Sequence, residues 1–553
     1  MDTPAQPDRF VHDRLPSPEQ MPALLFGAPE LQFPPVLNVV EELLDKAAQK
    51  AWANRPMLRS NVLTLTYAQA HERVKRIAQV LVQDFGLVPG NRVLLRGGNS
   101  VGLALAWLAV VKAGLVAVAT MPLLRAKELG DIIDKAQPVL ALCDAKLLAE
   151  LQMAQAQYPV LKTIVAFDGA ASAPAAPVGA GEVDASLEGL ASAKDGQFRA
   201  AATAATDIAL LAFTSGTTGK PKAAVQTHRD LLASCETWPR HVLRATPDDI
   251  VMGSPPLAFT FGLGGMLVFP MWAGASVYFP SVPYTPQAMA QLVFESGATI
   301  CYTAPTFSRQ MAPFIKALVA ERGAPALRIC VSAGEGLPDA TRQLWKDASG
   351  IEMLDGIGAT EMFHIFISSA PGEVRRGAIG KVVPGYRAKV VDDSGAEVPR
   401  GTVGKLAVIG PTGCKYMDDA RQASYVKAGW NYPGDAFLQD ADGYFFYQAR
   451  TDDMIITAGY NVGAPEVEDA LLKHPAVAEC GVIGKPDEER GMLVKAFCVL
   501  KPGCIGDEAM TRALQDHVKA TIAPYKYPRE IEFRASLPRT ETGKLQRFRL
   551  KQA

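Results

Sequence analysis

Short apolar runs alternate with helical stretches along the first half of the chain. Runs at 92–95, 139–143 and 163–167 have the length of buried strands, and further strand and helix units follow between residues 250 and 350. This alternation predicts an α/β fold with a large N-terminal domain of wound sheets. Residues 168–205, rich in Ala, Gly, Pro and Ser, predict an irregular connection.

The longest apolar stretch, residues 103–124, raises the question of a membrane span. Lys112 and Gly114 interrupt it, so we expect a buried helix that ends at these residues and then a strand at 115–119. On this interpretation the protein does not enter a membrane.

The pattern changes in the second half of the chain. Residues 379–409 are rich in Val and Gly and predict a small β-rich lobe. A compact run with a basic tail begins after Arg450, so we place a boundary at Asp452, with an N-terminal domain at 1–451 and a small α+β C-terminal domain at 452–553. We expect this second domain to contain helices at 465–472 and about 507–520, and strands at 479–483 and 495–500.

The composition is that of a globular protein with more than one core. The chain has 553 residues, of which 48% are hydrophobic and 20% charged. A formal net charge of −1 gives no bulk attraction to nucleic acid or to an anionic membrane. Eight cysteines without C-x-x-C pairs and a polar N-terminus without a signal-peptide core favour a reducing, cytoplasmic location.

One loop carries the strongest chemical signal. The apolar run 208–213 predicts a buried strand, and it is followed directly by Thr214-Ser215-Gly216-Thr217-Thr218-Gly219-Lys220-Pro221-Lys222. Backbone N–H groups, hydroxyls and lysines at a strand end suit an anion, with the triphosphate of ATP as first candidate. The spacing does not meet G-x-x-x-x-G-K-[ST], so this is a phosphate loop of another kind; the alternative is a plain surface turn.

This string resembles the signature loop of the adenylate-forming superfamily of acyl-CoA synthetases, luciferases and adenylation domains. Similar segments follow in the right order over nearly the whole chain, from Thr66 to Lys544. The resemblance implies that the loop residues bind ATP and that a mobile C-terminal domain carries a catalytic lysine, here Lys544. Taken alone, the terminal lysine could equally belong to a solvated basic tail.

Two further segments resemble the superfamily's nucleotide site. Residues 332–336, with Gly334, Glu335 and Gly336, are similar to the segment that lines the adenine pocket. Residues 355–361 are similar to the Y-G-x-T-E segment, with Ile357 in place of the tyrosine. The nucleotide-binding and catalytic residues implied there are Asp355, Gly356, Thr360, which contacts a phosphate, and Glu361, which reaches Mg²⁺.

The resemblance also assigns roles to four more positions. Asp435, in a segment similar to W-x-x-T-G-D, accepts hydrogen bonds from both ribose hydroxyls, and Arg450 contacts the nucleotide. Asp452 falls at the hinge of the domain rotation, and Gly459 lies in the loop that enters the site afterwards, where a side chain would block the pantetheine arm of coenzyme A. The alternative for Asp435 is a turn residue and that for Arg450 a surface cation, whereas Asp452 taken alone is best interpreted as an exposed linker acid.

The acyl pocket resembles that of aryl-CoA ligases of the benzoate and 2-aminobenzoate type. The bulky residues Phe259, Phe261 and Tyr302 would close a short pocket that suits a flat ring and excludes a long alkyl chain. Small residues leave room for the ring, and two polar residues are open between packing and contact with the carboxylate or an ortho substituent. The small residues are Ala304, Gly358 and Ala359, and the polar ones are Thr260 and His364.

The activity implied is an ATP- and Mg²⁺-dependent ligation of an aryl carboxylate to coenzyme A through an aroyl-AMP. Two other functions stay open at this point. One is an adenylation protein that loads a carrier-protein arm, and the other is a non-catalytic nucleotide-binding protein, which the presence of Lys544, Glu361 and Asp435 disfavours. No nucleic acid or membrane partner is expected, and the oligomeric state is open, a homodimer included.

Overall fold

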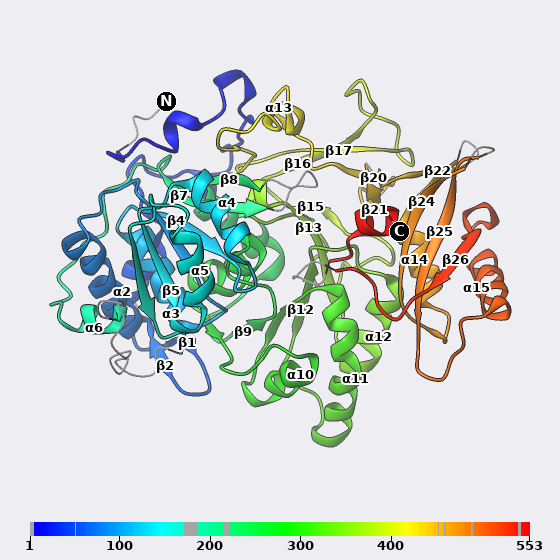
Figure 1. Cartoon of the computed structure of the whole chain (residues 1–553), viewed down its shortest axis with the longest axis horizontal. Coiled ribbons are helices and arrows are strands. Elements are labelled where there is room, and N and C mark those ends of the chain that lie inside the picture. Colours follow the sequence, from blue (N-terminus) through cyan, green and yellow to red (C-terminus); the bar gives the residue numbers. More distant parts are fainter. Residues whose placement is uncertain are drawn as a thin grey trace.

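The computed structural model describes residues 5–49, 51–170, 186–214, 221–451, 453–457, 460–487, 490–539 and 544–552. Within these ranges the chain forms three sheets in its large N-terminal part and a fourth in a C-terminal domain, drawn in orange and red in Figure 1. Residues 215–220 of the predicted phosphate loop, together with Asp452 and Gly459, lie outside the described residues.

The first sheet has the strand order β6-β5-β3-β4-β7-β8 and is parallel except for the β7–β8 pair. Successive strand residues enter different buried layers: Val93 and Leu95 pack with α2 and α3, and Leu94 packs with α4 and α5. Because both faces are covered, its strands read as continuous apolar runs, as the sequence predicted. The elements are β3 Arg92–Arg96, β4 Val116–Thr120, β5 Leu140–Asp144, β6 Thr163–Phe167, β7 Ile208–Thr214, β8 Lys222–Thr227, α2 Tyr67–Gln79, α3 Val101–Lys112, α4 Ala126–Ala136 and α5 Leu148–Gln155.

Helix α3 and strand β4 confirm the interpretation of the longest apolar stretch. Every residue of α3 is buried, and the buried ammonium of Lys112 is paired with Asp45. Gly114 follows with a φ of +73°, which reverses the chain before β4. In the described part of the chain no helix is both long and apolar enough to cross a bilayer.

The second sheet has the order β15-β14-β13-β12-β11-β9-β10-β1-β2. Helices α10, α11 and α12 cover one face, where Met289, Ile315 and Trp345 pack on Cys301 and Cys330 of the strands. The opposite face shares the main core with α2 and α3. The elements are β1 Pro56–Arg59, β2 Thr64–Thr66, β9 Ile250–Gly253, β10 Ser276–Tyr278, β11 Ile300–Thr303, β12 Ile329–Ala333, β13 Met353–Gly358, β14 Ile365–Ser368, β15 Lys381–Val382, α7 His228–Cys235, α8 Thr260–Leu263, α9 Phe269–Ala273, α10 Pro286–Glu295, α11 Pro305–Arg322 and α12 Asp339–Ser349.

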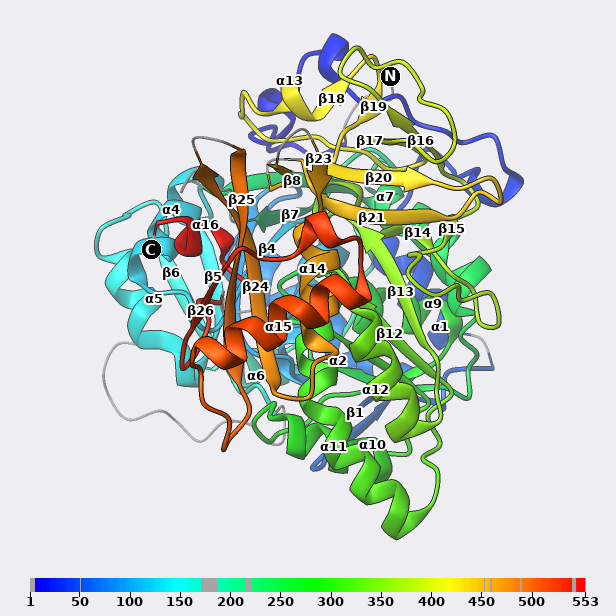
Figure 2. The same ribbon diagram turned by 90° about the vertical axis from the view of Figure 1, so that its right-hand side faces the viewer.

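The expected β-rich lobe is present and extends beyond its predicted end. It is a sheet of order β18-β19-β17-β20-β21, with β16 paired to β17, and it runs on to Arg450. Figure 2 shows it as the yellow layer above the other sheets. The elements are β16 Arg387–Val391, β17 Val403–Ile409, α13 Gln422–Tyr425, β18 Val426–Lys427, β19 Trp430–Asn431, β20 Asp435–Gln439 and β21 Phe445–Arg450.

The C-terminal domain is an antiparallel sheet of order β23-β22-β25-β24, with β26 added parallel to β25. Its core joins Val467 of α14 and Leu514 of α15 to the strands. Both predicted helices are confirmed, and both predicted strands are longer than expected. The elements are β22 Ile455–Thr457, β23 Tyr460–Val462, α14 Ala464–Leu472, β24 Val477–Asp487, β25 Gly491–Leu500, α15 Glu508–Thr521, β26 Glu530–Phe533 and α16 Arg547–Lys551.

The prediction of an irregular connection at 168–205 was wrong in one part. Helix α6, Leu187–Ser192, lies within it, begins at Ser186, whose hydroxyl accepts a hydrogen bond from the N–H of Gly189, and buries Leu187 and Ala191. The composition hid this helix because its six residues, of which Leu187, Leu190 and Ala191 pack against the core, are too few to show a repeated helical period.

Candidate active site

The predicted nucleotide segments meet at the carboxyl ends of two neighbouring parallel strands. In the β12–β13 pair, Ser332 lies opposite Asp355 and Ala333 opposite Gly356. Residues 334–336 therefore leave the sheet beside the segment that leads to Thr360 and Glu361. Strand β14 pairs antiparallel to β13, so the parallel winding ends here, at the kind of edge where α/β sheets bind ligands.

Asp355 lies beneath this edge and is 3% exposed. Its Oδ1 accepts a hydrogen bond from the N–H of Gly356, and Arg342 is 3.9 Å away. Desolvation raises the pKa of Asp355 to about 7, against the opposing effect of Arg342. The side chain thus contributes to the base of the site through buried contacts.

Glu361 is held in a short hydrogen-bonded chain. The amide of Gln226 donates to the carbonyls of Thr360 (2.9 Å) and Glu361 (3.3 Å), which fixes the backbone. The hydroxyl of Tyr416 donates to Oε1 of Glu361, and Nζ of Lys222 lies 3.2 Å from that hydroxyl. Desolvation and the charge of Glu361 raise the pKa of Tyr416 far above its ordinary value, so the phenol stays a donor.

Tyr416 was missed in the sequence because it stands 55 residues from Glu361 and belongs to none of the matched motifs. An isolated bridge between Ala224 and Tyr416, with backbone hydrogen bonds on either side of it, brings its segment against β8. Lys222, expected at a phosphate, is thereby placed next to the carboxylate expected at the metal.

Asp435 and Arg450 face each other across the β20–β21 hairpin. Nη1 of Arg450 donates to Oδ1 of Asp435 at 3.2 Å and to the carbonyl of Pro433 at 2.8 Å. Asp435 is 7% exposed. Gly434 has a φ of +84°, which favours glycine in this turn, and a Cβ there would stand 2.8 Å from Nη2 of Arg450, so a side chain would displace the guanidinium.

The terminal lysine reaches the same place from the C-terminal domain. A Cβ built on Gly334 would lie 3.5 Å from Cε and 3.9 Å from Nζ of Lys544. Desolvation lowers the pKa of Lys544, although part of the residue remains exposed, and the nearby carboxylates of Glu335, Asp435 and Glu361 oppose this. The structure therefore brings Lys544 within electrostatic reach of three predicted site carboxylates.

Glu335 connects the two domains. The hydroxyl of Thr306 donates to its Oε2 at 3.0 Å, and Nη1 of Arg539, from the C-terminal segment, lies 3.3 Å from the same hydroxyl. Desolvation raises the pKa of Glu335, against the charges of Arg539 and Lys544. Tyr447 packs 3.4 Å from the Cβ position of Gly336, so a ring from the lobe borders this segment.

The predicted acyl residues form an aromatic cluster behind this edge. The rings of Phe261 and Tyr302 meet edge to face, with 5.6 Å between their centroids. The imidazole of His364 lies 5.5 Å from Phe261, 4.5 Å from Phe269 and 5.4 Å from Trp238. Trp238 also contacts Tyr302 and was not predicted, because it comes from a helical segment far from every matched motif.

His364 is 4% exposed and neutral. Desolvation lowers its pKa to about 3. Its Nε2 lies 3.3 Å from the carbonyl of Phe261 and must donate to it, so the neutral ring presents Nδ1 as an acceptor. Nδ1 is buried and has no hydrogen-bond partner among the described residues.

The small and flanking pocket residues divide into two groups. The first group is half-buried. Ala304 precedes α11, Ala359 precedes Thr360, and Phe259 precedes α8. Gly358 is exposed, but a Cβ there would stand 2.4 Å from the carbonyl oxygen of His364. Close backbone packing therefore explains this glycine without reference to a ligand. Thr260, buried as the first residue of α8, remains open between packing and contact.

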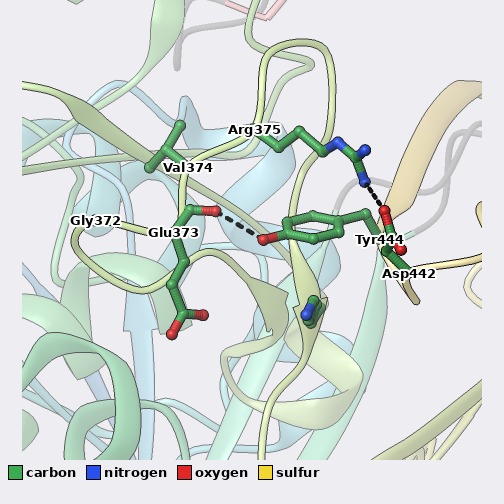
Figure 3. A pocket seen from close by; sticks show the side chains of 7 residues that line it. Gly372, Glu373, Val374, Arg375, Asp442 and Tyr444 are labelled. Carbon is green, nitrogen blue, oxygen red and sulfur yellow. Dashed lines mark hydrogen bonds and ion pairs between the residues drawn. The ribbon is translucent and has the colours of Figure 1, made fainter.

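A surface pocket elsewhere is not part of this site. It is lined by residues of the 372–375 turn together with Lys381, Asp442 and Tyr444 (Figure 3). Arg375 pairs with Asp442 at 3.0 Å, and the Tyr444 hydroxyl donates to the carbonyl of Glu373. No predicted site residue lines this pocket.

Two family models match the chain: the AMP-binding enzyme model over residues 44–415, and the AMP-binding enzyme C-terminal domain model over residues 466–544. The chain belongs to the AMP-binding enzyme family, and its resemblance to adenylate-forming enzymes is confirmed. The benzoate–CoA ligase of Thauera aromatica is 34% identical over 528 residues, which cover 95% of this chain and 98% of that protein.

Solved structures agree over the same length. The anthranilate CoA ligase AuaEII in complex with anthranoyl-AMP has a TM-score of 0.88 and 34% identity, covering 95% of this chain and 98% of that one. The benzoate CoA ligase from Burkholderia xenovorans LB400 has a TM-score of 0.82 and 30% identity, covering 93% of this chain and 100% of that one. The α/β fold with a C-terminal domain is thus confirmed.

Proposed function

We propose that the protein is an ATP-dependent aryl acid–CoA ligase, which forms an aroyl-adenylate and then an aroyl-CoA thioester. The observation that carries this proposal is the convergence of Lys544, Asp435 and Glu361 at one sheet edge that adjoins the aromatic cluster of Phe261 and Tyr302. A charged site for a nucleotide next to an aromatic wall suits an aryl carboxylate and its adenylate. The benzoate and anthranilate ligases that resemble the chain over its whole length support this.

We assign ATP to residues 214–222 and to Asp435, whose carboxylate would accept hydrogen bonds from both ribose hydroxyls. Glu361 fits Mg²⁺ in the chemistry of its donors, which are hard carboxylate oxygens, and Thr360 would contact a phosphate. The described residues contain no group of three or more His, Cys, Asp or Glu side chains that could hold a metal, which suits an ion bound mainly through substrate phosphates. Bound with ATP, Mg²⁺ would neutralise phosphate charge.

In the first half-reaction a carboxylate oxygen of the acid attacks the α-phosphorus, the bond from this phosphorus to the bridging oxygen breaks, and pyrophosphate leaves. The ammonium of Lys544 would contact both the acid and the α-phosphate and stabilise the charge of the in-line transition state. The desolvation that lowers its pKa also strengthens that interaction.

In the second half-reaction the thiol of coenzyme A loses its proton and attacks the acyl carbon, and AMP leaves. We assign the hinge of the intervening domain rotation to Asp452 and the passage of the pantetheine arm to Gly459. Lys544 would act in the first step only, since rotation withdraws its whole segment.

For the acid itself we favour 2-aminobenzoate over benzoate. His364 is a neutral acceptor at Nδ1, and an ortho amino group is a donor that would satisfy it once the half-buried ring of Phe261 makes room. Benzoate offers no donor. A long alkyl chain would clash with Phe261 and Tyr302. Acetate would lose roughly 0.8 kcal/mol of binding free energy for each missing buried carbon.

The test is CoA-dependent AMP formation with 2-aminobenzoate, benzoate, octanoate and acetate, on wild type, His364→Ala and Thr260→Ala. We expect both aryl acids far ahead of the others, and a lower 2-aminobenzoate/benzoate ratio in His364→Ala. A preference for octanoate would refute the aryl assignment. Pyrophosphate release that does not proceed to AMP when CoA is added would instead indicate loading of a carrier protein.

A further inference from the structure

We propose that Tyr416 is a positioning residue that holds the carboxylate of Glu361 in the orientation needed to bind the metal of the metal–ATP complex. The proposal rests on the assignment of Mg²⁺ to Glu361 above and adds to it a residue from the distant lobe, together with the means by which it acts. Its basis is a buried chain of contacts that ends at one of the two carboxylate oxygens.

The first observation concerns which oxygen is occupied. Tyr416 donates to Oε1 of Glu361, and among the described residues no hydrogen bond is made to Oε2. A carboxylate bound at one oxygen keeps its plane and presents the other oxygen in a defined direction. Glu361 is 8% exposed, so no bulk water competes with the phenol for Oε1.

The second observation is that Tyr416 is itself fixed from three sides. It is 1% exposed, and its N–H donates to Oε1 of Gln422 at 2.9 Å. Its ring meets that of Tyr425 edge to face at 5.7 Å, and Nζ of Lys222 lies 5.0 Å from the ring centroid and 3.2 Å from the hydroxyl. The phenol hydroxyl therefore has one available orientation, in which it donates its hydrogen to Glu361 and accepts a hydrogen bond from Lys222 on its lone pair.

This arrangement links the phosphate loop to the metal ligand. Lys222 is the last residue of the phosphate loop and the first of β8, and in the described part of the chain its hydrogen-bond path to Glu361 runs through the Tyr416 hydroxyl. Hydrogen bonds to a metal-ligating carboxylate orient it, and their loss typically costs 10- to 100-fold in metal affinity. Tyr416→Phe removes the bond and keeps the ring.

The experiment compares wild type, Tyr416→Phe and Tyr425→Phe. Tyr425 is a matched control: its ring belongs to the same buried cluster, while its hydroxyl has no partner among the described residues. Mn²⁺ binding to the ATP-loaded protein is measured by electron paramagnetic resonance without any aryl acid, and pyrophosphate exchange is measured against Mg²⁺ concentration.

We expect Tyr416→Phe to weaken Mn²⁺ binding at least about tenfold and to raise the half-saturating Mg²⁺ concentration by a similar factor, with the maximal rate at saturating Mg²⁺ near wild type. Tyr425→Phe should match wild type in both. Equal metal affinity in Tyr416→Phe and wild type would overturn the proposal, as would equal losses in the two variants. Because the resonance measurement needs no acid, a wrong aryl assignment leaves its outcome unchanged.

Discussion

At the scale of single residues, the charge of Lys544 is the feature with the sharpest consequence. Its ammonium lies in range of Glu335, Asp435 and Glu361, and desolvation lowers its pKa. Because carboxylates hold this cation in place before the substrate binds, it needs little reorganisation when negative charge develops at the α-phosphate in the transition state.

We expect Lys544→Ala to reduce acyl-adenylate formation by 10²-fold or more, because it removes a charge that acts in the first transition state. Thioester formation from supplied aroyl-AMP and CoA should stay within about threefold of wild type. Pyrophosphate exchange and the thioester assay measure the two steps separately. Equal losses in both would show that the lysine acts elsewhere. Lys551, which pairs with Asp453 on the surface, provides the control Lys551→Ala.

At the scale of elements, the β20–β21 hairpin shows how a turn can place a binding residue. Gly434→Ala would push a Cβ to within 2.8 Å of the Arg450 guanidinium and displace it from Asp435. We expect the KM for ATP to rise about tenfold, since an unpaired or shifted carboxylate loses about 1.4 kcal/mol of binding.

A glycine in the same hairpin separates backbone strain from this contact. Gly443 has a φ of +86°, close to that of Gly434, but a Cβ there meets only Nε2 of Gln439 at 3.9 Å. Gly443→Ala should therefore lower the melting temperature about as much as Gly434→Ala and leave the KM for ATP unchanged. If both variants raise the KM equally, the Arg450 contact is not the cause.

Strand β13 carries a second consequence, through the buried Asp355. Its folded pKa of about 7 exceeds the ordinary value near 4, so between these pH values the native state holds a proton that the unfolded chain has lost. Stability should fall as the pH rises from about 4 to 7 and then level off. Asp355→Asn should remove most of this pH dependence and raise the free energy of unfolding at pH 8 by roughly a few kcal/mol. Melting temperatures from pH 4.5 to 8 test this, and an unchanged slope in the variant would contradict it.

At the scale of the whole molecule, the two domains share a helix cap. The N-terminus of α12 follows Pro338 and has no side-chain cap from its own domain. Oδ1 of Asp469, on α14 of the C-terminal domain, accepts a hydrogen bond from the N–H of Ala340 at 3.1 Å, and Lys473 pairs with both Asp469 and Asp339. Figure 2 shows α14 beside α12. This contact stabilises the arrangement in which Lys544 lies at Gly334.

We expect Asp469→Ala to slow pyrophosphate exchange about fivefold, because loss of a cap costs about 1 kcal/mol, and to leave thioester formation from supplied aroyl-AMP unchanged. Asp507→Ala is the matched control, since Asp507 caps α15 within one domain. It should lower the stability of the domain and affect both steps equally. A parallel loss in both steps with Asp469→Ala would mean that the contact carries no preference between domain arrangements.

The local pattern by itself determined which elements form and which loops carry chemistry. Short continuous apolar runs predicted β3, β5 and β6, and the polar string after β7 predicted an anion loop, because such patterns depend on neighbours in the chain. Helix α6 was not predicted because its six residues are too few to show a repeated helical period. The domain boundary at Asp452 and the roles of the site residues stay predictions.

Only the tertiary structure decided which distant residues share a charge or a hydrogen bond. Tyr416 and Glu361, Asp469 and Ala340, and Trp238 and His364 are joined by packing between elements far apart in sequence, and no local pattern specifies such a pair. The same holds for Gly358, which the sequence assigns to ring clearance and which the fold places against the carbonyl of His364. A sequence records the spacing of residues along the chain, whereas a pKa, a cap or a metal ligand's orientation depends on what the folded chain places around each group.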